Sequence, residues 1–253
     1  EGSSRSHYIR TLSTLLAQNN MRSCVIHFRG CGGEINEKPR SYHGGDTRDP
    51  NFVIQQIQKR YPENQLFAVG YSLGAGVLLK WLGEKGHTSP IKAAVAVSVP
   101  FDLGASAKQL ETGMSQIYQY WLLRHMKNTV RKKAHLLSDV VNIPNLLRTK
   151  TCRAFDDLGT APVHRFRDAE DYYTTSSCRN SLGNVLIPVL IIQAIDDPLI
   201  CPLSIPNPSE LGPTITLEVS RYGGHVGFVG KSTSNLSKHW LDARIMEYLN
   251  SWR

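Results

Sequence analysis

The sequence predicts an α/β fold in which a mainly parallel sheet is flanked by helices and carries a helical cap insertion. Segments with helical apolar spacing alternate with short apolar runs typical of buried strands, at residues 24–28, 66–69, 93–99, 187–194 and 215–219. Strands separated by helices need crossover connections, which build parallel sheets covered on both faces. Residues 104–182 are helically patterned and too many for a loop.

The flanking helices are indicated by apolar spacing and by capping residues. A surface helix is expected over residues 6–18, and a last amphipathic helix is expected around Trp240, Leu241, Ile245 and Leu249. The Asp-Pro pair at 49–50 predicts a helix start, and this helix would end before Pro62. A further helix is expected over residues 77–85.

We expect one domain built from three stretches of chain. Residues 1–103 would form the first part of the core, residues 104–182 the helical cap and residues 183–253 the second part of the core. A chain of 253 residues, of which 41% are hydrophobic, can bury one sizeable core. The absence of repeats and low-complexity stretches favours a globular protein.

The cysteines and the apolar runs exclude several protein classes. The five cysteines are odd in number and form no CxxC pair, which favours a reducing compartment over a disulfide framework or a zinc site. We read Cys31 as a packing residue. No apolar run approaches eighteen residues, so no membrane span is expected. The sequence thus predicts a cytoplasmic protein without metal or cofactor. The chain begins at Glu1 and looks like a fragment or a processed chain, so an anchor ahead of it stays open.

The basic charge raises the question of anionic partners. The formal net charge is +8, and basic residues outnumber acidic ones between residues 104 and 182. These residues are not interleaved with aromatic stacking positions, so no nucleic-acid partner is expected. A weak membrane-surface contact through the basic cap stays open, although a solvated helix is the preferred reading of this region. The oligomeric state is left undetermined.

The stretch GYSLGAG at residues 70–76 is the most informative motif. It follows a predicted strand and precedes a predicted helix, which is the setting of a nucleophile elbow with Ser72 at a strained apex. We expect Gly70 and Gly74 to be required, because a β-carbon at either place would collide with the neighbouring strand or helix. The N–H groups at the start of that helix, including that of Leu73, would point at the oxygen of whatever group Ser72 attacks. Alternatively, Ser72 is an ordinary polar residue in a glycine-rich turn.

A base and an acid for Ser72 follow the last two strands. Asp196 and Asp197 come after the strand that ends at Ala194, and His225 comes after the final strand. This is the chain order Ser, Asp, His, and the ends of parallel strands would bring the three side chains to one sheet edge. Asp197, which precedes a proline, is favoured as the acid, while Asp196 stays the alternative.

A polar cluster follows the first predicted strand. It contains His27, Arg29, Arg40, Tyr42, His43 and Asp46. A hydrogen-bonded network that braces the glycine-rich turn is favoured over direct substrate binding. The stretch FDDLGTAP at residue 155 is expected to anchor the return of the cap to the sheet.

Six motifs together resemble the YheT-like branch of the α/β-hydrolases. They are HFRGCGGE at residue 27, PRSYHGGDT at 39, VGYSLGAG at 69, FDDLGTAP at 155, DDPLICP at 196 and GGHVGF at 223. This branch includes yeast ethanol acyltransferases and animal lipid-ester hydrolases. The resemblance implies an α/β-hydrolase fold and ester chemistry with Ser72, Asp197 and His225 as the triad. In members of this branch the corresponding stretch reads GYSLGGN, so that Ala75 and Gly76 of this chain stand where the branch has a glycine and an asparagine.

The resemblance predicts a gap in the sheet. In the family, EGS follows a strand whose loop donates one N–H to the oxyanion, so this chain would lack its first strands and that donor. We expect residues 24–28 to be either unpaired with residues 66–69 or moved across to them. Without one oxyanion donor, the rate would fall more than about a hundredfold.

The sequence therefore predicts a serine esterase that acts through an acyl-enzyme on carboxylic esters, either small-molecule esters with a short- or medium-chain acyl group or lipid esters. One alternative is an acyltransferase that passes the acyl group to an alcohol. Another is a hydrolase-fold binding module without activity. The natural substrate and the acyl chain length stay open.

Overall fold

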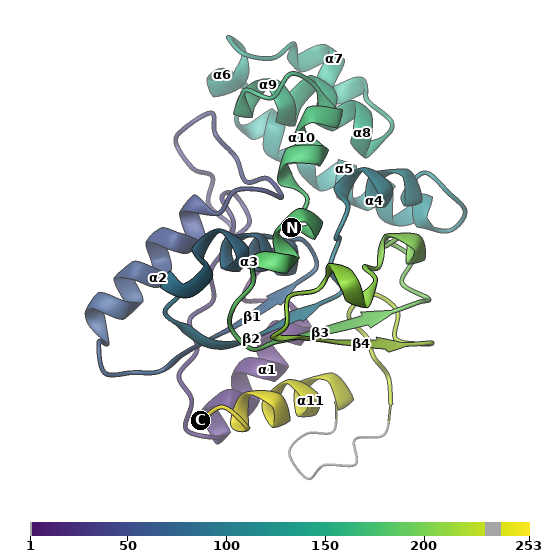
Figure 1. The fold of residues 1–253 in the computed structure, drawn as a ribbon. Helices are drawn as coiled ribbons and strands as arrows, with labels where there is room; N and C mark the ends of the chain where they lie inside the picture. The colour runs from purple at the N-terminus through teal and green to yellow at the C-terminus, as the bar shows by residue number, and fades with distance from the viewer. Residues whose placement is uncertain (1, 231–238) are drawn as a thin grey trace.

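The sheet at the centre of the molecule has four parallel strands. The computed structural model describes residues 2–230 and 239–253 (Figure 1). The strand order β1-β2-β3-β4 follows the chain, and the strands are Leu66–Tyr71, Ile91–Val97, Val189–Ala194 and Ile215–Ser220. The carboxyl ends of parallel strands meet at one edge, so the loops that follow β1, β3 and β4 share that edge. The predicted fold class is confirmed.

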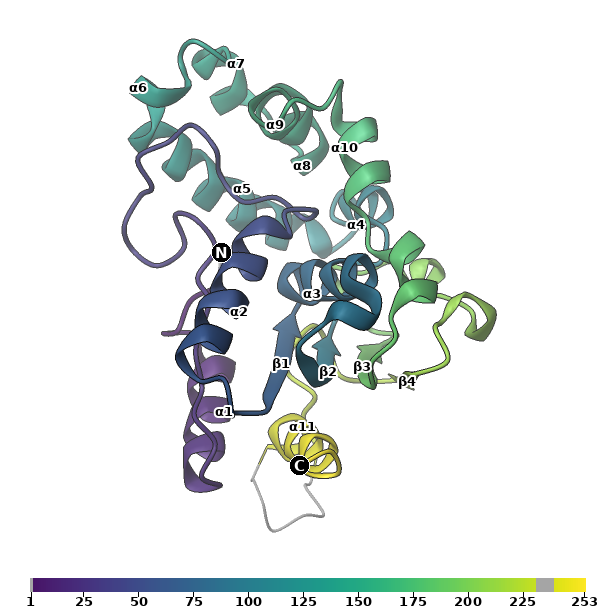
Figure 2. The ribbon, with the colours of Figure 1, turned by 60° about the vertical axis from the view of Figure 1, so that its left-hand side comes forward.

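The strand side chains alternate between two cores, as the pleat requires. On one face, the core includes Val95, Val97, Leu190 and Ile192 and is covered by α1 (His7–Gln18) and α11 (Trp240–Asn250). On the other face lies α3 (Leu73–Lys85), which packs on Ala94, Ala96, Val189 and Ile191. Figure 2 shows α11 below the sheet and α3 above it. Both faces are therefore covered.

Helices α4–α10 form a layer beyond the carboxyl ends of the strands (Figure 2). They are inserted between β2 and β3, and their bounds are Leu103–Gln109, Ser115–Lys132, Ala134–Leu137, Ile143–Arg148, Cys152–Phe155, Ala161–His164 and Ala169–Ser176. A π-helical turn, Asp156–Thr160, joins α8 to α9. The layer has two apolar clusters of its own, so it is a packed cap and not a loop.

The predicted strand over residues 24–28 is wrong. Residues 21–28 form no strand, and α2 (Arg48–Arg60) is the next regular element after α1. β1 pairs only with β2 in the described sheet, so residues 24–28 have no ladder with residues 66–69. The first of the two outcomes expected for this segment, an unpaired one, is confirmed. An apolar run without a neighbouring strand cannot satisfy its backbone groups as a strand.

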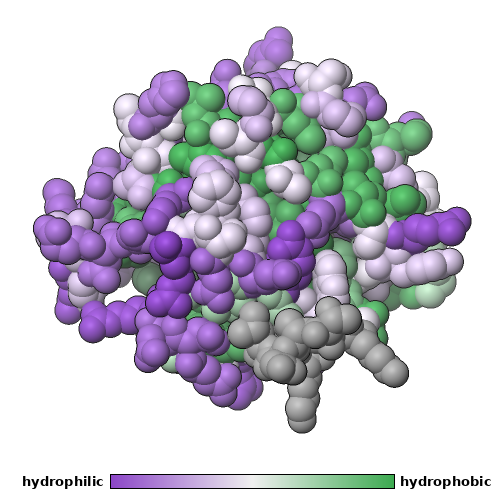
Figure 3. Space-filling model, turned by 60° about the horizontal axis from the view of Figure 1, so that its bottom comes forward, coloured by the Kyte–Doolittle hydropathy of each residue, from purple (hydrophilic) through white to green (hydrophobic). Residues whose placement is uncertain are grey.

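The surface opposite the cap is uneven in hydropathy. Figure 3 shows hydrophilic residues on the left and front of this lower face, and hydrophobic residues in a band toward its upper right. Among the described residues, no helix is long and apolar enough to cross a membrane.

Candidate active site

Ser72 lies at the sharp turn between β1 and α3. Its backbone φ is +52°, which is unusual for a residue other than glycine and strained. The turn is held because the Ser72 N–H donates to the Val97 carbonyl at 2.8 Å and the Ser72 carbonyl accepts from Ala75 N–H at 2.9 Å. Strand, strained serine and helix form the elbow that the sequence predicted.

The two glycines that flank Ser72 differ in the room that they leave for a β-carbon. A β-carbon on Gly70 would lie 2.7 Å from the Ala75 α-carbon and 2.8 Å from the Gly74 carbonyl oxygen. A β-carbon on Gly74 would meet only the ring of Phe28, at 4.0 Å. The expected collision is therefore correct for Gly70 and wrong for Gly74, because only Gly70 faces the backbone of the turn.

His225 and Asp197 are hydrogen-bonded to each other. His225 Nδ1 lies 2.8 Å from Oδ2 and 3.0 Å from Oδ1 of Asp197. Asp197 is 3% exposed, and its Oδ1 also accepts from the Leu199 N–H at 2.9 Å. A buried carboxylate at Nδ1 fixes the ring and leaves Nε2 free to act as a base.

Asp196 binds the backbone of the loop that carries His225 and not the imidazole. Its Oδ1 accepts from the backbone N–H groups of Gly223 and Gly224, each at 2.9 Å. It thereby ties the loop after β3 to the loop that carries His225. Of the two neighbouring aspartates, the structure brings Asp197 and not Asp196 to the imidazole.

Ser72 and His225 are not hydrogen-bonded in this structure. Among the described residues, Ser72 Oγ has no hydrogen-bond partner, and the only partner of the His225 ring is Asp197. The backbone carbonyl of His225 accepts from the Ser98 hydroxyl, which holds the loop against the end of β2. Catalytic hydrogen bonds are often long before substrate binds, so this arrangement permits a base that closes on the serine later.

Leu73 is the first residue of α3. The N–H groups at the start of an α-helix have no intrahelical acceptor, and the helix dipole adds positive potential there. The Leu73 N–H is therefore available to an oxyanion formed at Ser72.

A cavity of about 280 Å³ lies between the nucleophile turn and the cap. Ser72 and Leu73 line it at the sheet edge, and its cap side is largely aliphatic, including Leu103, Ala107, Leu110, Leu122, Met126 and Val130. A largely apolar cavity beside a serine suits the chain of an acyl group.

The cavity also has polar walls. The rings of His43 and His164 both line it, with centroids 4.5 Å apart. Burial lowers the pKa of each imidazole to about 4, so both are neutral at pH 7. Neutral imidazoles can offer a hydrogen bond to a substrate without adding charge to the cavity.

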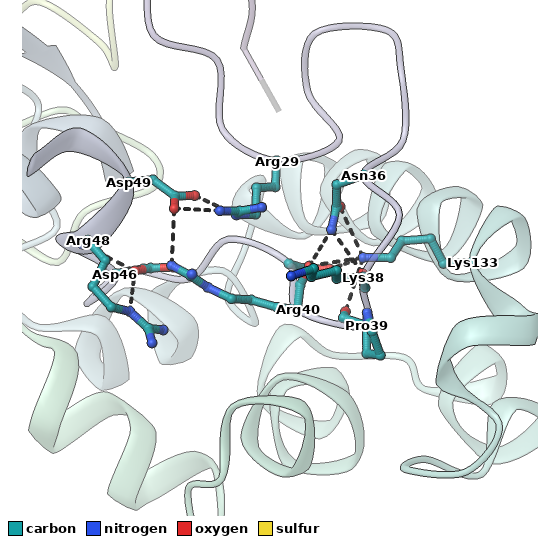
Figure 4. Close-up of polar contacts among 10 residues, drawn as sticks. Arg29, Asn36, Lys38, Pro39, Arg40, Asp46, Arg48, Asp49 and Lys133 are labelled. Carbon is teal, nitrogen blue, oxygen red and sulfur yellow. Dashed lines mark hydrogen bonds and ion pairs between the residues drawn. The ribbon is translucent and has the colours of Figure 1, made fainter. Parts of the chain in front are cut away.

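The polar cluster after residue 27 is mostly a brace (Figure 4). The Arg29 guanidinium donates to the two carboxylate oxygens of Asp49 at 2.6 Å and 2.7 Å. The Arg40 guanidinium forms ion pairs with both Asp46 and Asp49. Arg48 Nε lies 3.3 Å from Asp46 Oδ1. His27 accepts from the Ser4 N–H at 2.8 Å, and Tyr42 stacks on Phe28. The predicted bracing role fits these residues, but His43 and Tyr42 also line the cavity.

Lys133, Asp156 and His164 are among the cap residues that line the cavity and that the sequence pattern did not predict. Burial raises the pKa of Asp156 to about 6, although the carboxylate accepts from Thr160 and Tyr173 at 2.6 Å and 2.8 Å. Asp156 belongs to FDDLGTAP, which was assigned only an anchoring role. Nothing in the spacing of Lys133 or His164 distinguishes a cavity-facing residue from a solvated one.

No metal site is apparent in residues 2–230 and 239–253. No group of three or more His, Cys, Asp or Glu side chains in these ranges could hold a metal ion.

Known proteins with similar sequences include several named as esterases, phospholipases or lipases. The sequence profile of the family described as alpha/beta hydrolase fold matches residues 2–232. The chain is 38% identical to the putative esterase YheT of Escherichia coli over 254 residues, covering all of this chain and 74% of that protein. It is 31% identical to human phospholipase ABHD3, covering 90% of this chain and 56% of that protein. The resemblance to the YheT-like branch is confirmed.

Solved structures with the same fold are more distant in sequence. An esterase of Pyrococcus furiosus, Pf2001, superposes with a TM-score of 0.62 at 17% identity, covering 99% of this chain and 78% of that chain. Mouse α/β hydrolase domain-containing protein 10 gives a TM-score of 0.55 at 11% identity, covering the whole chain and 87% of that one. These support the fold alone. By its family profile and its relatives, the chain belongs to the α/β-hydrolase family, and it is similar to members named as an esterase and a phospholipase.

Proposed function

We propose that this protein is a serine hydrolase of carboxylic esters with Ser72, His225 and Asp197 as its triad. The observation that carries the proposal is the hydrogen bond between His225 and the buried Asp197, at the sheet edge where the strained Ser72 lines a cavity. The names of the relatives, a putative esterase and a phospholipase, support the reaction class. The chain spans 74% of the first relative and 56% of the second, so the activity of the whole protein is part of this proposal.

Each side chain of the proposed triad has one role in the reaction. His225 Nε2 accepts the proton from Ser72 Oγ as the oxygen attacks the ester carbonyl, while Asp197 holds the proton on Nδ1 and stabilises the imidazolium. The Leu73 N–H binds the oxyanion. The imidazolium then gives its proton to the leaving alkoxide, and an acyl group stays on Ser72. Water, deprotonated by the same imidazole, releases the acid.

The substrate class follows from the cavity. About 280 Å³ with mainly aliphatic walls suits an acyl chain of short or medium length. A yeast relative, 27% identical, is named medium-chain fatty acid ethyl ester synthase/esterase 2, which supports this range. We infer that the alcohol part of the ester lies toward the sheet edge and solvent.

The test is labelling and turnover with matched variants. A fluorophosphonate probe should label the wild-type protein and not Ser72→Ala, and nitrophenyl esters of graded chain length should be hydrolysed only by the wild type. Ser209→Ala is the control, since Ser209 is exposed and does not line the cavity. Labelling that survives in Ser72→Ala rejects Ser72 as the nucleophile. No labelling of the wild type rejects the proposal and favours a binding module.

Acyl transfer to an alcohol is the second candidate. The name of the yeast relative combines ester synthesis with hydrolysis, and both reactions share the same acyl-enzyme. With ethanol added to a hydrolysis reaction, a transferase forms ethyl ester at the expense of acid. A product ratio that does not respond to ethanol excludes transfer to this alcohol.

A further inference from the structure

The residue that follows α5, Lys133, is a fully buried cation. Its side chain is 0% exposed. Its Nζ donates to four oxygens, which all belong to the turn at residues 36–41: Asn36 Oδ1 at 3.1 Å, Pro39 O at 3.0 Å, Arg40 O at 3.1 Å and Ser41 Oγ at 3.2 Å (Figure 4). An ammonium has only three hydrogens, so these neutral acceptors saturate it.

No carboxylate balances this charge. Among the described residues, no ion pair joins Lys133 to an acidic side chain within 4.0 Å. Burial, with a smaller contribution from Arg29, lowers the pKa of Lys133 to about 8, so it is still protonated at neutral pH. Figure 4 shows the Arg40 guanidinium turned away, toward Asp46 and Asp49. A buried, unpaired cation is costly, and an apolar side chain would fill the same space without that cost.

The turn that Lys133 holds continues into the wall of the cavity. Ser41, Tyr42 and His43 line the cavity together with Ser72. Next along the chain, a β-carbon on Gly44 would lie 3.1 Å from Leu73 Cδ1, so this segment abuts the nucleophile turn. Residues 41–43 are thus placed between the cap and the reacting serine.

The segment has a second and a third anchor. The Arg40 side chain bridges Asp46 and Asp49 beside the start of α2. The Gly44 N–H donates to the hydroxyl of Tyr172, in α10 of the cap, at 3.0 Å. Of these anchors, only Lys133 ties the turn at residues 36–41 to the cap, so its loss would release the turn from α5.

We propose that Lys133 is a positioning residue, which ties the turn at residues 36–41 to α5 and thereby holds residues 41–43 as the wall of the acyl cavity. It touches no reacting atom. This inference rests on the proposed function, because it takes the cavity beside Ser72 as the acyl site. A substrate whose chain fills the cavity depends on the wall, and an acetyl ester does not.

The experiment compares Lys133→Met with Lys132→Met, which removes the same charge from the adjacent, exposed lysine. In Lys133→Met, KM for a nitrophenyl octanoate should rise about tenfold, the effect of one charge-assisted hydrogen bond, while kcat stays unchanged. Both constants for nitrophenyl acetate should stay within twofold. Lys132→Met should behave as the wild type with both esters.

A second readout does not depend on catalysis. Hydrogen–deuterium exchange of peptides that span residues 36–44 should be faster in Lys133→Met than in the wild type and unchanged in Lys132→Met. If Lys133→Met does not fold, Asn36→Ala, which removes one of the four acceptors, is examined by the same two measurements and should change both in the same direction.

The outcomes separate this inference from the proposed function. Hydrolysis that survives in Ser72→Ala rejects the proposed function, and exchange then still tests the tie between the turn and α5. The role of Lys133 is refuted if hydrolysis depends on Ser72 but Lys133→Met has the wild-type KM for octanoate and the wild-type exchange of residues 36–44. Equal loss with acetate and octanoate also refutes it, because that pattern indicates general structural damage.

Discussion

The Nδ1 atom of His225 lies 2.8 Å from Oδ2 of Asp197, although 27 residues separate the two in the chain. The neighbouring Asp196 instead accepts two backbone N–H groups of the loop that carries His225. One aspartate therefore orients the imidazole, and the other shapes the loop.

This division predicts different effects for two matched variants. Asp197→Asn should lower kcat about 10⁴-fold, because an amide at Nδ1 favours the wrong tautomer of the imidazole. Asp196→Asn keeps an acceptor oxygen for Gly223 and Gly224 and should lower kcat less than about tenfold. Steady-state kinetics on a short nitrophenyl ester measures both. Equal losses would contradict the assignment of Asp197.

The nucleophile turn predicts opposite results for its two glycines. Gly70→Ala places a β-carbon against the backbone of Ala75 and should destabilise the protein by about 3 kcal/mol or abolish folding. Gly74→Ala has room and lies inside α3, so it should be neutral or stabilising by up to about 1 kcal/mol. Urea unfolding followed by circular dichroism gives both free energies. A Gly74→Ala variant as unstable as Gly70→Ala would refute this reading of the turn.

The cavity predicts a change in chain-length preference. Ala107, in α4, lines the cavity and is 6% exposed, so Ala107→Leu should fill part of it. We expect kcat/KM to fall at least about tenfold for the longest accepted ester and to stay unchanged for acetate. Ala105→Leu in the same helix is the control, since Ala105 does not line the cavity. An unchanged profile in Ala107→Leu would mean that the acyl chain binds elsewhere.

The buried His43 predicts a loss of stability in acid. Burial lowers its pKa to about 4, so between pH 6.5 and pH 4 the unfolded chain binds a proton that the folded protein does not. The unfolding free energy should therefore fall as the pH falls through this range, by up to about 3 kcal/mol from this group. In His43→Gln the fall should be smaller, whereas His87→Gln, at an exposed position, should match the wild type. Urea titrations at pH 7 and pH 4.5 measure the unfolding free energy of each protein. An equal loss of unfolding free energy between the two pH values in all three proteins would contradict the prediction.

Local pattern was enough to predict the elements that carry the candidate triad. The apolar runs before Ser72, Asp197 and His225 are strands of one parallel sheet, and a parallel sheet must bring its strand ends to one edge. Residues 24–28 show the limit of this reasoning. Their composition is that of a strand, but a strand also needs a neighbour with which to pair, and no short window of sequence contains it.

The sequence by itself determined the order of the four sheet strands and of the helices that flank them, the glycine-flanked serine and the chain order of the three candidate catalytic residues, because spacing and backbone sterics act locally. Only the tertiary structure decided that Asp197 meets the imidazole, that Gly74 has room for a side chain and that Lys133 is enclosed by a turn about ninety residues away in the chain. The physical reason is that burial and hydrogen-bond partners depend on which distant segments pack together. A lysine in solvent and a lysine among four oxygens look the same in the sequence.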